Sequence, residues 1–219
     1  STFFDNSAGL TPASTLNVDA SIDLEASGSV VLDAFSVLIA KGSFKVQLGT
    51  TIELGADGQV GGTGLDADTE YQAMALTLGS TAFTGADEVE VFIGVGGSLD
   101  DNPEGSATPT DFSDDEINVE SGLGFYANLA SLSLVTLKDN NGTPTVATDD
   151  VSYMGLELGN LSASLLGIDG LSFGVYGVTL KLNQANDTDN NDLTTPAKLD
   201  WSTFFDNSAG LTPASTLNV

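Results

Sequence analysis

Apolar and polar residues alternate with a period of two along much of this chain. From Leu16 to Ala26 every even-numbered residue is apolar and every odd-numbered residue is polar. The same alternation returns at residues 44–48, 52–54, 74–78 and 178–183. Successive side chains of a β-strand point to opposite faces, so this period indicates strands with one buried and one solvated face. No apolar stripe with the helical period persists between capping residues, and we predict an all-β protein with helix as a minor component.

Three further segments are apolar without alternation, at residues 30–39, 89–95 and 132–137. Such runs are typical of strands buried on two sides, and we predict that role for them. Asn141-Gly142 lies between two apolar runs, and this dipeptide favours a tight hairpin turn. We therefore predict that residues 130–138 pair antiparallel with a strand inside residues 145–158.

The two ends of the chain are identical. Residues 1–18 read STFFDNSAGLTPASTLNV, and residues 202–219 repeat this sequence without a mismatch, at an offset of 201 (202 minus 1). We predict that residues 1–201 are one complete repeat unit and that residues 202–219 begin the next, so that the chain is a slice of a longer tandem array. The alternative is an engineered chain whose first segment was copied to complete a broken sheet. In both cases the junction between units is structural.

The junction also bears on architecture. No Gly-, Ser- or Pro-rich linker separates Lys198 from Ser202, so we expect units that are packed or fused rather than flexibly joined. The expected fold is an elongated β-rich repeat unit, built as stacked antiparallel sheets or a β-solenoid-like rod, that continues into the next repeat. The alternative is a tandem series of discrete β-sandwich modules.

Aromatic residues gather at this junction. The single Trp of the chain lies beside two Phe, and aromatic side chains bury large apolar areas. We predict a seam between repeats, against the alternative that these residues belong to the ordinary core of one unit. The predicted seam residues are Trp201, Phe204, Phe205 and the first-copy residues Phe3 and Phe4.

Composition narrows the setting. The chain has 31 Asp and Glu against five Lys, a net charge of −26, and 41% apolar residues. This charge excludes nucleic acid as a partner and suits an extracellular, salt-rich or calcium-rich environment. There is no Cys and no His, which removes thiol nucleophiles, imidazole bases and the usual zinc ligands. We expect no enzyme activity, and no apolar run is long enough to span a membrane as a helix.

The acidic residues cluster in loops. Asp187-Thr-Asp189-Asn-Asn191 has the spacing that lets alternate side chains converge on one ion, and calcium prefers such oxygen ligands. The loop is not an EF-hand, because Asp192 occupies the sixth position and Lys198 the twelfth. We expect at least one calcium site. The candidate ligands are Asp57, Asp66, Asp100, Asp101, Asp114, Asp115, Asp139, Asp149, Asp150, Asp187, Asp189, Asn191 and Asp192.

Residues 61–69, GGTGLDADT, resemble the calcium-binding nonapeptide of the RTX family, through Gly61, Gly62, Gly64 and Asp66. Residues 55–57 repeat the Gly-x-Asp core nine residues earlier. The large apolar position of the motif is occupied by Asp68 in one copy and Gln59 in the other. The resemblance implies a single bound calcium ion near Asp57 and Asp66, rather than a complete β-roll.

More broadly, the chain is similar to the repeat regions of giant bacterial surface proteins of the adhesin or fibre type. The likeness rests on the tandem period, on Asn- and Asp-rich turns such as residues 139–143, and on the missing Cys. It implies a structural module of an extracellular or cell-surface fibre, whose partners are adjacent copies of the repeat and, through lateral assembly, other chains. The alternative function is a repeat that itself binds carbohydrate or a host surface.

Overall fold

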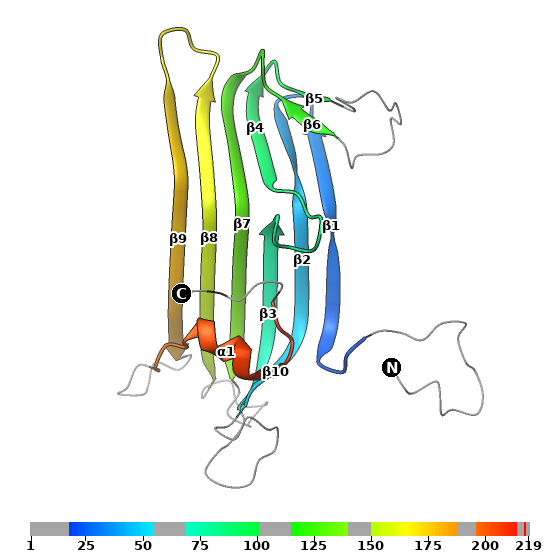
Figure 1. Cartoon of the computed structure of the whole chain (residues 1–219), viewed down its shortest axis with the longest axis vertical. Coiled ribbons are helices and arrows are strands. Elements are labelled where there is room, and N and C mark those ends of the chain that lie inside the picture. Colours follow the sequence, from blue (N-terminus) through cyan, green and yellow to red (C-terminus); the bar gives the residue numbers. More distant parts are fainter. Residues whose placement is uncertain are drawn as a thin grey trace, which may run out of the picture.

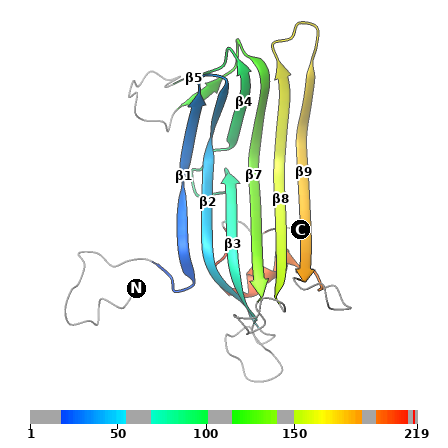
Figure 2. The same ribbon diagram turned by 180° about the vertical axis from the view of Figure 1, so that it is seen from behind.

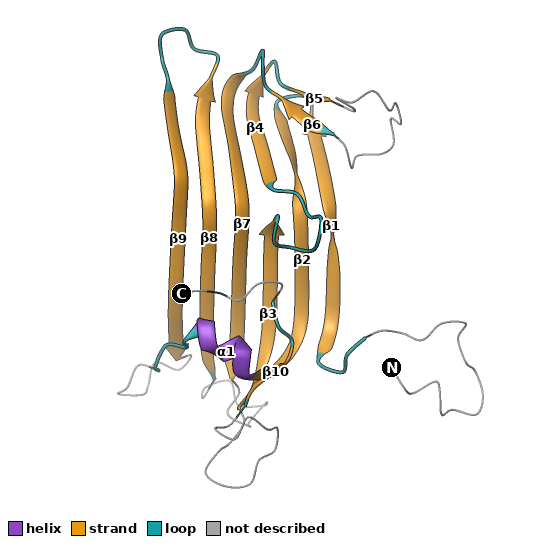
Figure 3. Ribbon diagram, viewed as in Figure 1, coloured by secondary structure: helices purple, strands orange, loops and turns teal. Residues whose placement is uncertain are grey.

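The computed structural model describes residues 18–54, 69–100, 115–139, 150–187, 196–213 and 217. These residues are all-β with antiparallel pairing and one short helix, so the predicted fold class is confirmed at this level (Figures 1 and 3). The elements are β1 (Ile22–Ala34), β2 (Leu38–Glu53), β3 (Thr69–Gly79), β4 (Val89–Val95), β5 (Ser98–Asp100), β6 (Glu116–Asn118), β7 (Leu123–Asp139), β8 (Val151–Leu166), β9 (Phe173–Asp187), α1 (Trp201–Asn207) and β10 (Ser208–Gly210).

One large sheet dominates the structure, with the strand order β1-β2-β3-β7-β8-β9. The short strands β3 and β4 share one position between β2 and β7: β3 occupies the half of the sheet near α1, and β4 the other half (Figure 1). We call these halves the lower and the upper end. β10 pairs with the lower end of β2, and β5 and β6 form a separate two-stranded sheet.

The alternating segments lie where the sequence predicts strands. Residues 44–48 and 52–53 belong to β2, 74–78 to β3, and 178–183 to β9. The predicted pairing of residues 130–138 is confirmed, because β7 and β8 are antiparallel neighbours with Leu132 opposite Leu158 and Leu137 opposite Tyr153. In the alternating segment 16–26, residues 22–26 open β1, while residues 16 and 17 lie outside the described ranges.

The prediction of double burial is wrong for all three apolar runs. Residues 30–39 hold the end of β1, a tight turn and the start of β2, and Phe35 in this turn is 99% exposed. Residues 89–95 do form β4, but Ile93 and Val95 are exposed. Residues 132–137 are buried on one side only, through Val135 and Leu137. A long apolar run therefore does not indicate double burial in this chain, because no described residue covers one face of the sheet.

All other described elements lie on the same side of the large sheet, which we call the covered face. Figure 1 shows α1 in front of its lower end and the β5–β6 hairpin in front of its upper end. Viewed from behind, in Figure 2, no described element lies in front of the strands. The upper cover forms a small core of Ile39, Phe92 and Ile117, and the lower cover forms a larger one around Trp201.

The opposite face, which we call the apolar face, is defined by the register. Paired residues share a face and neighbouring residues alternate. In β1 (from residue 24), β2 and β3 the apolar face holds the even-numbered residues, and in β4 the odd-numbered ones. In β7 it holds the odd-numbered residues of 123–129 and the even-numbered residues of 132–138, and in β8 the even-numbered residues of 152–158 and the odd-numbered residues of 161–165. In β9 it holds residues 173 and 175 and the even-numbered residues of 178–186.

The alternation in β7, β8 and β9 shifts by one residue at the middle of the sheet. Tyr126 of β7 contacts the upper core and Val135 belongs to the lower core, so an even and an odd residue share the covered face. The shift falls at Ala130, whose carbonyl accepts a hydrogen bond from the Ser80 backbone N–H at 2.9 Å, and at the opposing Asn160, which has φ 56°. β9 is irregular at the same level and places Gly177 at φ 64°. This line of irregularities keeps one face apolar along strands of 15 to 17 residues.

The shift in alternation can be tested at Asn160, which has a left-handed backbone conformation. Asn tolerates positive φ, whereas an L-residue with an ordinary Cβ loses about 1 kcal/mol there. We expect Asn160→Ala to lower the free energy of unfolding by about that amount, and Asn160→Gly to remain the more stable of the two variants. Urea unfolding of both variants is the measurement. Because Asn160 is exposed, lost contacts contribute little, and an Ala variant more stable than the Gly variant would contradict the assigned conformation.

Candidate functional site

The strongest candidate site is the aromatic cluster at the lower end of the covered face. Trp201 is fully buried, and it packs with Phe204 and Phe205 of α1 on a floor made by β3 and β7. The floor residues are small or aliphatic, which leaves room for the rings above them. They are Ala73, Ala75, Val135 and Leu137, and Tyr71 closes one side.

The rings meet in edge-on and tilted contacts. Phe204 and Phe205 are T-shaped with centroids 5.1 Å apart, and Trp201 lies 5.9 Å from Phe205. Tyr71 of β3 meets Phe204 edge-on at 5.5 Å and Tyr153 of β8 at 6.0 Å. Such pairs add about 1 kcal/mol each beyond the area that they bury. The cluster therefore ties the segment after β9 to the centre of the sheet.

Position 155 in β8 is shaped for the Trp201 ring. A Cβ added to Gly155 would lie 2.7 Å from Cε2 of Trp201 and 2.7 Å from Cδ1 of Leu217. The indole thus rests directly on the backbone of β8. Its Nε1–H donates to Oδ1 of Asn183 at 3.1 Å, and the amide of Asn183 donates in turn to the Leu199 carbonyl at 2.8 Å. The apolar part of the Trp201 ring is therefore packed against β8, and its N–H group is hydrogen-bonded.

The helix that carries these rings begins at an acidic cap. Oδ1 of Asp200 accepts hydrogen bonds from the backbone N–H of Ser202 at 3.1 Å and from its hydroxyl at 2.6 Å. These bonds stabilise the charged carboxylate, so the pKa of Asp200 lies below its usual value. The arrangement is the N-cap expected for Asp before a first helical turn, and it orients α1 over the sheet.

The second copy, residues 202–219, continues past α1 as an added strand. Ser208, Ala209 and Gly210 form β10 against Glu53, Ile52 and Thr51 of β2. The Leu211 N–H then donates to the Thr50 carbonyl at 2.8 Å, and the side chains of Leu211 and Leu217 are buried in the same core. The predicted seam residues Trp201, Phe204 and Phe205 thus lie together; Phe3 and Phe4 are outside the described residues.

Tyr71 is a member of the site that the sequence analysis did not single out. Its hydroxyl donates to Oε2 of Glu53 at 3.2 Å, and its ring is buried against Phe204. Burial, followed by the nearby charge of Glu53, raises the pKa of the Tyr71 phenol, so it stays a neutral donor. Nothing in the local pattern of β3 separates Tyr71 from the other apolar positions, and only the register brings it to the second copy.

The candidate calcium ligands are only partly described. Asp57, Asp66, Asp101, Asp114, Asp149, Asp189, Asn191 and Asp192 lie outside the described ranges. Asp100 ends β5, and the buried Asp115 precedes β6 and accepts a hydrogen bond at its carbonyl from Nζ of Lys41 at 2.7 Å. In the ranges that the structure covers, no group of three or more acidic residues is placed to hold a metal ion.

Three other candidate calcium ligands lie close together at the lower end of the sheet. Asp139 of β7 and Asp187 of β9 both pair with Val151, one from each side. Asp150 directly precedes Val151, the first residue of β8. Asp150 is buried, and its carboxylate forms an ion pair with Nζ of Lys138 at 2.6 Å. A lysine thus already neutralises the most buried of these carboxylates. The structure brings the strand ends together as the hairpin prediction implies, without showing a complete ligand set.

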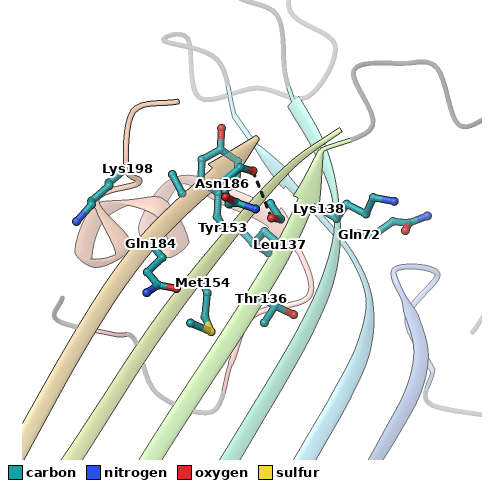
Figure 4. A pocket seen from close by; sticks show the side chains of 11 residues that line it. Gln72, Thr136, Leu137, Lys138, Tyr153, Met154, Gln184, Asn186 and Lys198 are labelled. Carbon is teal, nitrogen blue, oxygen red and sulfur yellow. Dashed lines mark hydrogen bonds between the residues drawn. The ribbon is translucent and has the colours of Figure 1, made fainter. Parts of the chain in front are cut away.

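The same end of the sheet holds a pocket of about 790 Å³ between the ends of β7, β8 and β9 (Figure 4). Amide, hydroxyl and ammonium groups line much of it, including those of Gln72, Gln184 and Lys198. Ser152 donates its hydroxyl to the Asn186 carbonyl at 3.3 Å. The one aromatic lining residue, Tyr153, already packs its ring against Tyr71. The lining therefore offers hydrogen bonds and no free aromatic surface for stacking.

Comparison with known protein families, curated proteins and solved structures finds no match to this chain. Among the described residues, no helix reaches the length and apolar character that a membrane span requires.

The contact between Gly155 and Trp201 generates a direct test. We expect Gly155→Ala to lower the free energy of unfolding by about 2 kcal/mol, because the rigid indole must move to admit the methyl group. Gly159→Ala is the matched control on the same strand and face, since its Cβ would meet the hydroxyl of Ser131 at 2.8 Å, which can rotate, and the Ser131 carbonyl oxygen only at 4.0 Å. Urea unfolding followed by Trp emission is the measurement, as the chain has one Trp. Equal losses in both variants would contradict the assigned packing.

Proposed function

We propose that this chain is a structural repeat module of a long extracellular fibre or surface protein, in which the opening segment of each repeat completes the core of the repeat before it. The observation that carries the proposal is the burial of the second copy. Residues 202–219 repeat the start of the chain, and Phe204, Phe205, Leu211 and Leu217 from this copy are buried on the sheet of the first unit.

This arrangement would make the junction between units part of the folded core. The second copy contributes two aromatic rings, a strand and all of α1 after Trp201 to a sheet made by residues 22–187, while the cap Asp200 belongs to the first unit. In a tandem array each unit would then be closed by the next one, and neighbours would be coupled by apolar burial rather than by a linker. The elongated, continuing architecture follows from this proposal, whereas discrete sandwiches would each need a complete core of their own.

The charge distribution suits such a fibre. On the covered face, Lys45 forms an ion pair with Glu25 at 3.4 Å and Lys181 with Glu157 at 3.3 Å. These lysines neutralise neighbouring carboxylates of the sheet. The remaining acidic excess, within a net charge of −26, keeps a long polymer soluble in a salt-rich exterior. We propose a scaffold or extension role outside the cell. Carbohydrate binding by the repeat itself gains no specific support from the pocket, because its lining has no free aromatic ring.

Removing the second copy tests the proposal. We expect residues 19–201, which lack both copies, to melt at least about 10 °C lower than the full chain, because the core loses four large apolar side chains. A synthetic peptide with the sequence of residues 202–219 should restore the melting temperature when added in trans. The same peptide with F204S and F205S is the control and should not restore it. Equal melting temperatures with and without the second copy would refute the proposed closure.

Calcium binding stays a prediction that rests on the acidic loops. We expect the full chain to melt about 5 °C higher or more in millimolar calcium than in EGTA with magnesium present, since an ion bound only to the folded state adds stability by mass action. Magnesium at the same ionic strength controls for charge screening. Coincident melting curves would show that the acidic residues are a solvated surface and that apolar packing alone holds the units.

A further inference from the structure

We infer that the apolar face is an interface with a second copy of this unit, packed face to face as the second layer of a β-sandwich. The inference does not depend on the proposed closure of the covered face, because it concerns the other side of the sheet.

The apolar face is almost free of charge. Among the positions that define it, the only charged residues are Glu70 and Lys138, both at the lower end. The polar residues Gln72, Ser152 and Asn186 lie near the same end, at the level of Lys138. Above the row that joins Val46 to Leu182, every position on this face is apolar or Gly. The charged strand residues Glu25, Lys45, Glu90, Glu157 and Lys181 face the other way, towards the covered face.

None of the large apolar side chains on this face is buried. Phe173 is 59% exposed, Val30 57%, Phe125 54% and Leu180 53%. These residues span the full width of the sheet, from β1 to β9. On the covered face, in contrast, Ile39, Phe92, Val135 and Trp201 are fully buried. The alternation of the strands has thus produced an apolar layer above the polar lower end, and no described residue covers this layer.

The size of the face fits an obligate interface. Six strand positions at about 4.8 Å and strands of about 50 Å give roughly 1,400 Å² per copy, or near 3,000 Å² for two. Stable homodimers bury about 2,000–5,000 Å², whereas the largest apolar patch on a soluble monomer covers about 300–600 Å². The face is therefore of the right size for a dimer, and its apolar part alone, without the polar lower end, is larger than the patch that a soluble monomer usually exposes.

A second copy is also the occupant that the chain favours. The described part of the second copy packs on the covered face, and the longest stretch outside the described ranges, residues 1–17, is too short to cover six strands. A flat apolar sheet is complementary to the same sheet turned over, and aligned sheets pack about 10 Å apart. Apart from Glu70 at the lower end, the acidic residues of the described strands face away from the apolar face, so the charge of −26 on each chain does not prevent face-to-face contact.

The oligomeric state of the full 219-residue chain tests the inference, by light scattering and sedimentation at about 0.15 M salt. We expect twice the chain mass at micromolar concentration. Leu180→Glu combined with Phe125→Glu should raise the dimer dissociation constant at least about a hundredfold, because it buries uncompensated charge in the interface. Thr179→Glu is the matched control: it is the neighbour of Leu180, is exposed, and points to the covered face, so it should leave the dimer intact. A monomeric full chain, or a dimer that survives the double substitution, would overturn the inference.

A second measurement covers the case in which the double variant does not fold. The chain has no Cys, so Leu158→Cys at the centre of the apolar face and Thr179→Cys on the covered face each carry one spin label. We expect an immobile label at position 158 and a mobile one at position 179. Equal mobility would refute the interface. A full chain that is monomeric alone and sediments with phosphatidylcholine vesicles would show that the face meets a lipid surface instead of a second copy.

Discussion

The apolar side chains of a β-sheet have to be withdrawn from water on each face that carries them, and this requirement organises the whole molecule. The large sheet satisfies it on one face by means of α1, the buried Leu211 and Leu217 that follow β10, and the β5–β6 hairpin. The rest of the structure follows from how few residues are available for this task. Long strands of up to 17 residues create more surface than one short helix and one hairpin can cover.

On the covered face the solution is local and aromatic. Trp201 rests on the bare backbone at Gly155, with Phe204 and Phe205 beside it, and the polar edge of the indole is satisfied by Asn183. The residues that complete this core come from a segment whose sequence also opens the chain. In the proposed array this makes folding and assembly one process, because a unit gains its lower core only when the next unit supplies it. On the opposite face we propose that a second copy of the unit provides the missing cover.

Several features could be predicted from the sequence. The period of two identifies β2, β3 and β9, and the Asn-Gly turn identifies the pairing of β7 with β8. The clustering of Trp201 with Phe204 and Phe205 follows from their proximity along the chain. The shift of alternation at Ala130 and Asn160 was not predictable, because a single residue in a left-handed conformation is not encoded in the apolar pattern. Double burial was wrongly predicted for the apolar runs at residues 30–39, 89–95 and 132–137 for a related reason, since the apolar pattern does not show which faces of a sheet are covered.

The sequence by itself determined that the chain is antiparallel β, that its ends are copies, and that its surface is strongly acidic. These are properties of local pattern and composition. Only the tertiary structure decided that β3 and β4 share one strand position, that Tyr71 meets Phe204, and that the charges of the sheet gather on one face. The physical reason is that register couples residues far apart in the sequence: a one-residue shift in any strand moves its side chains to the other face.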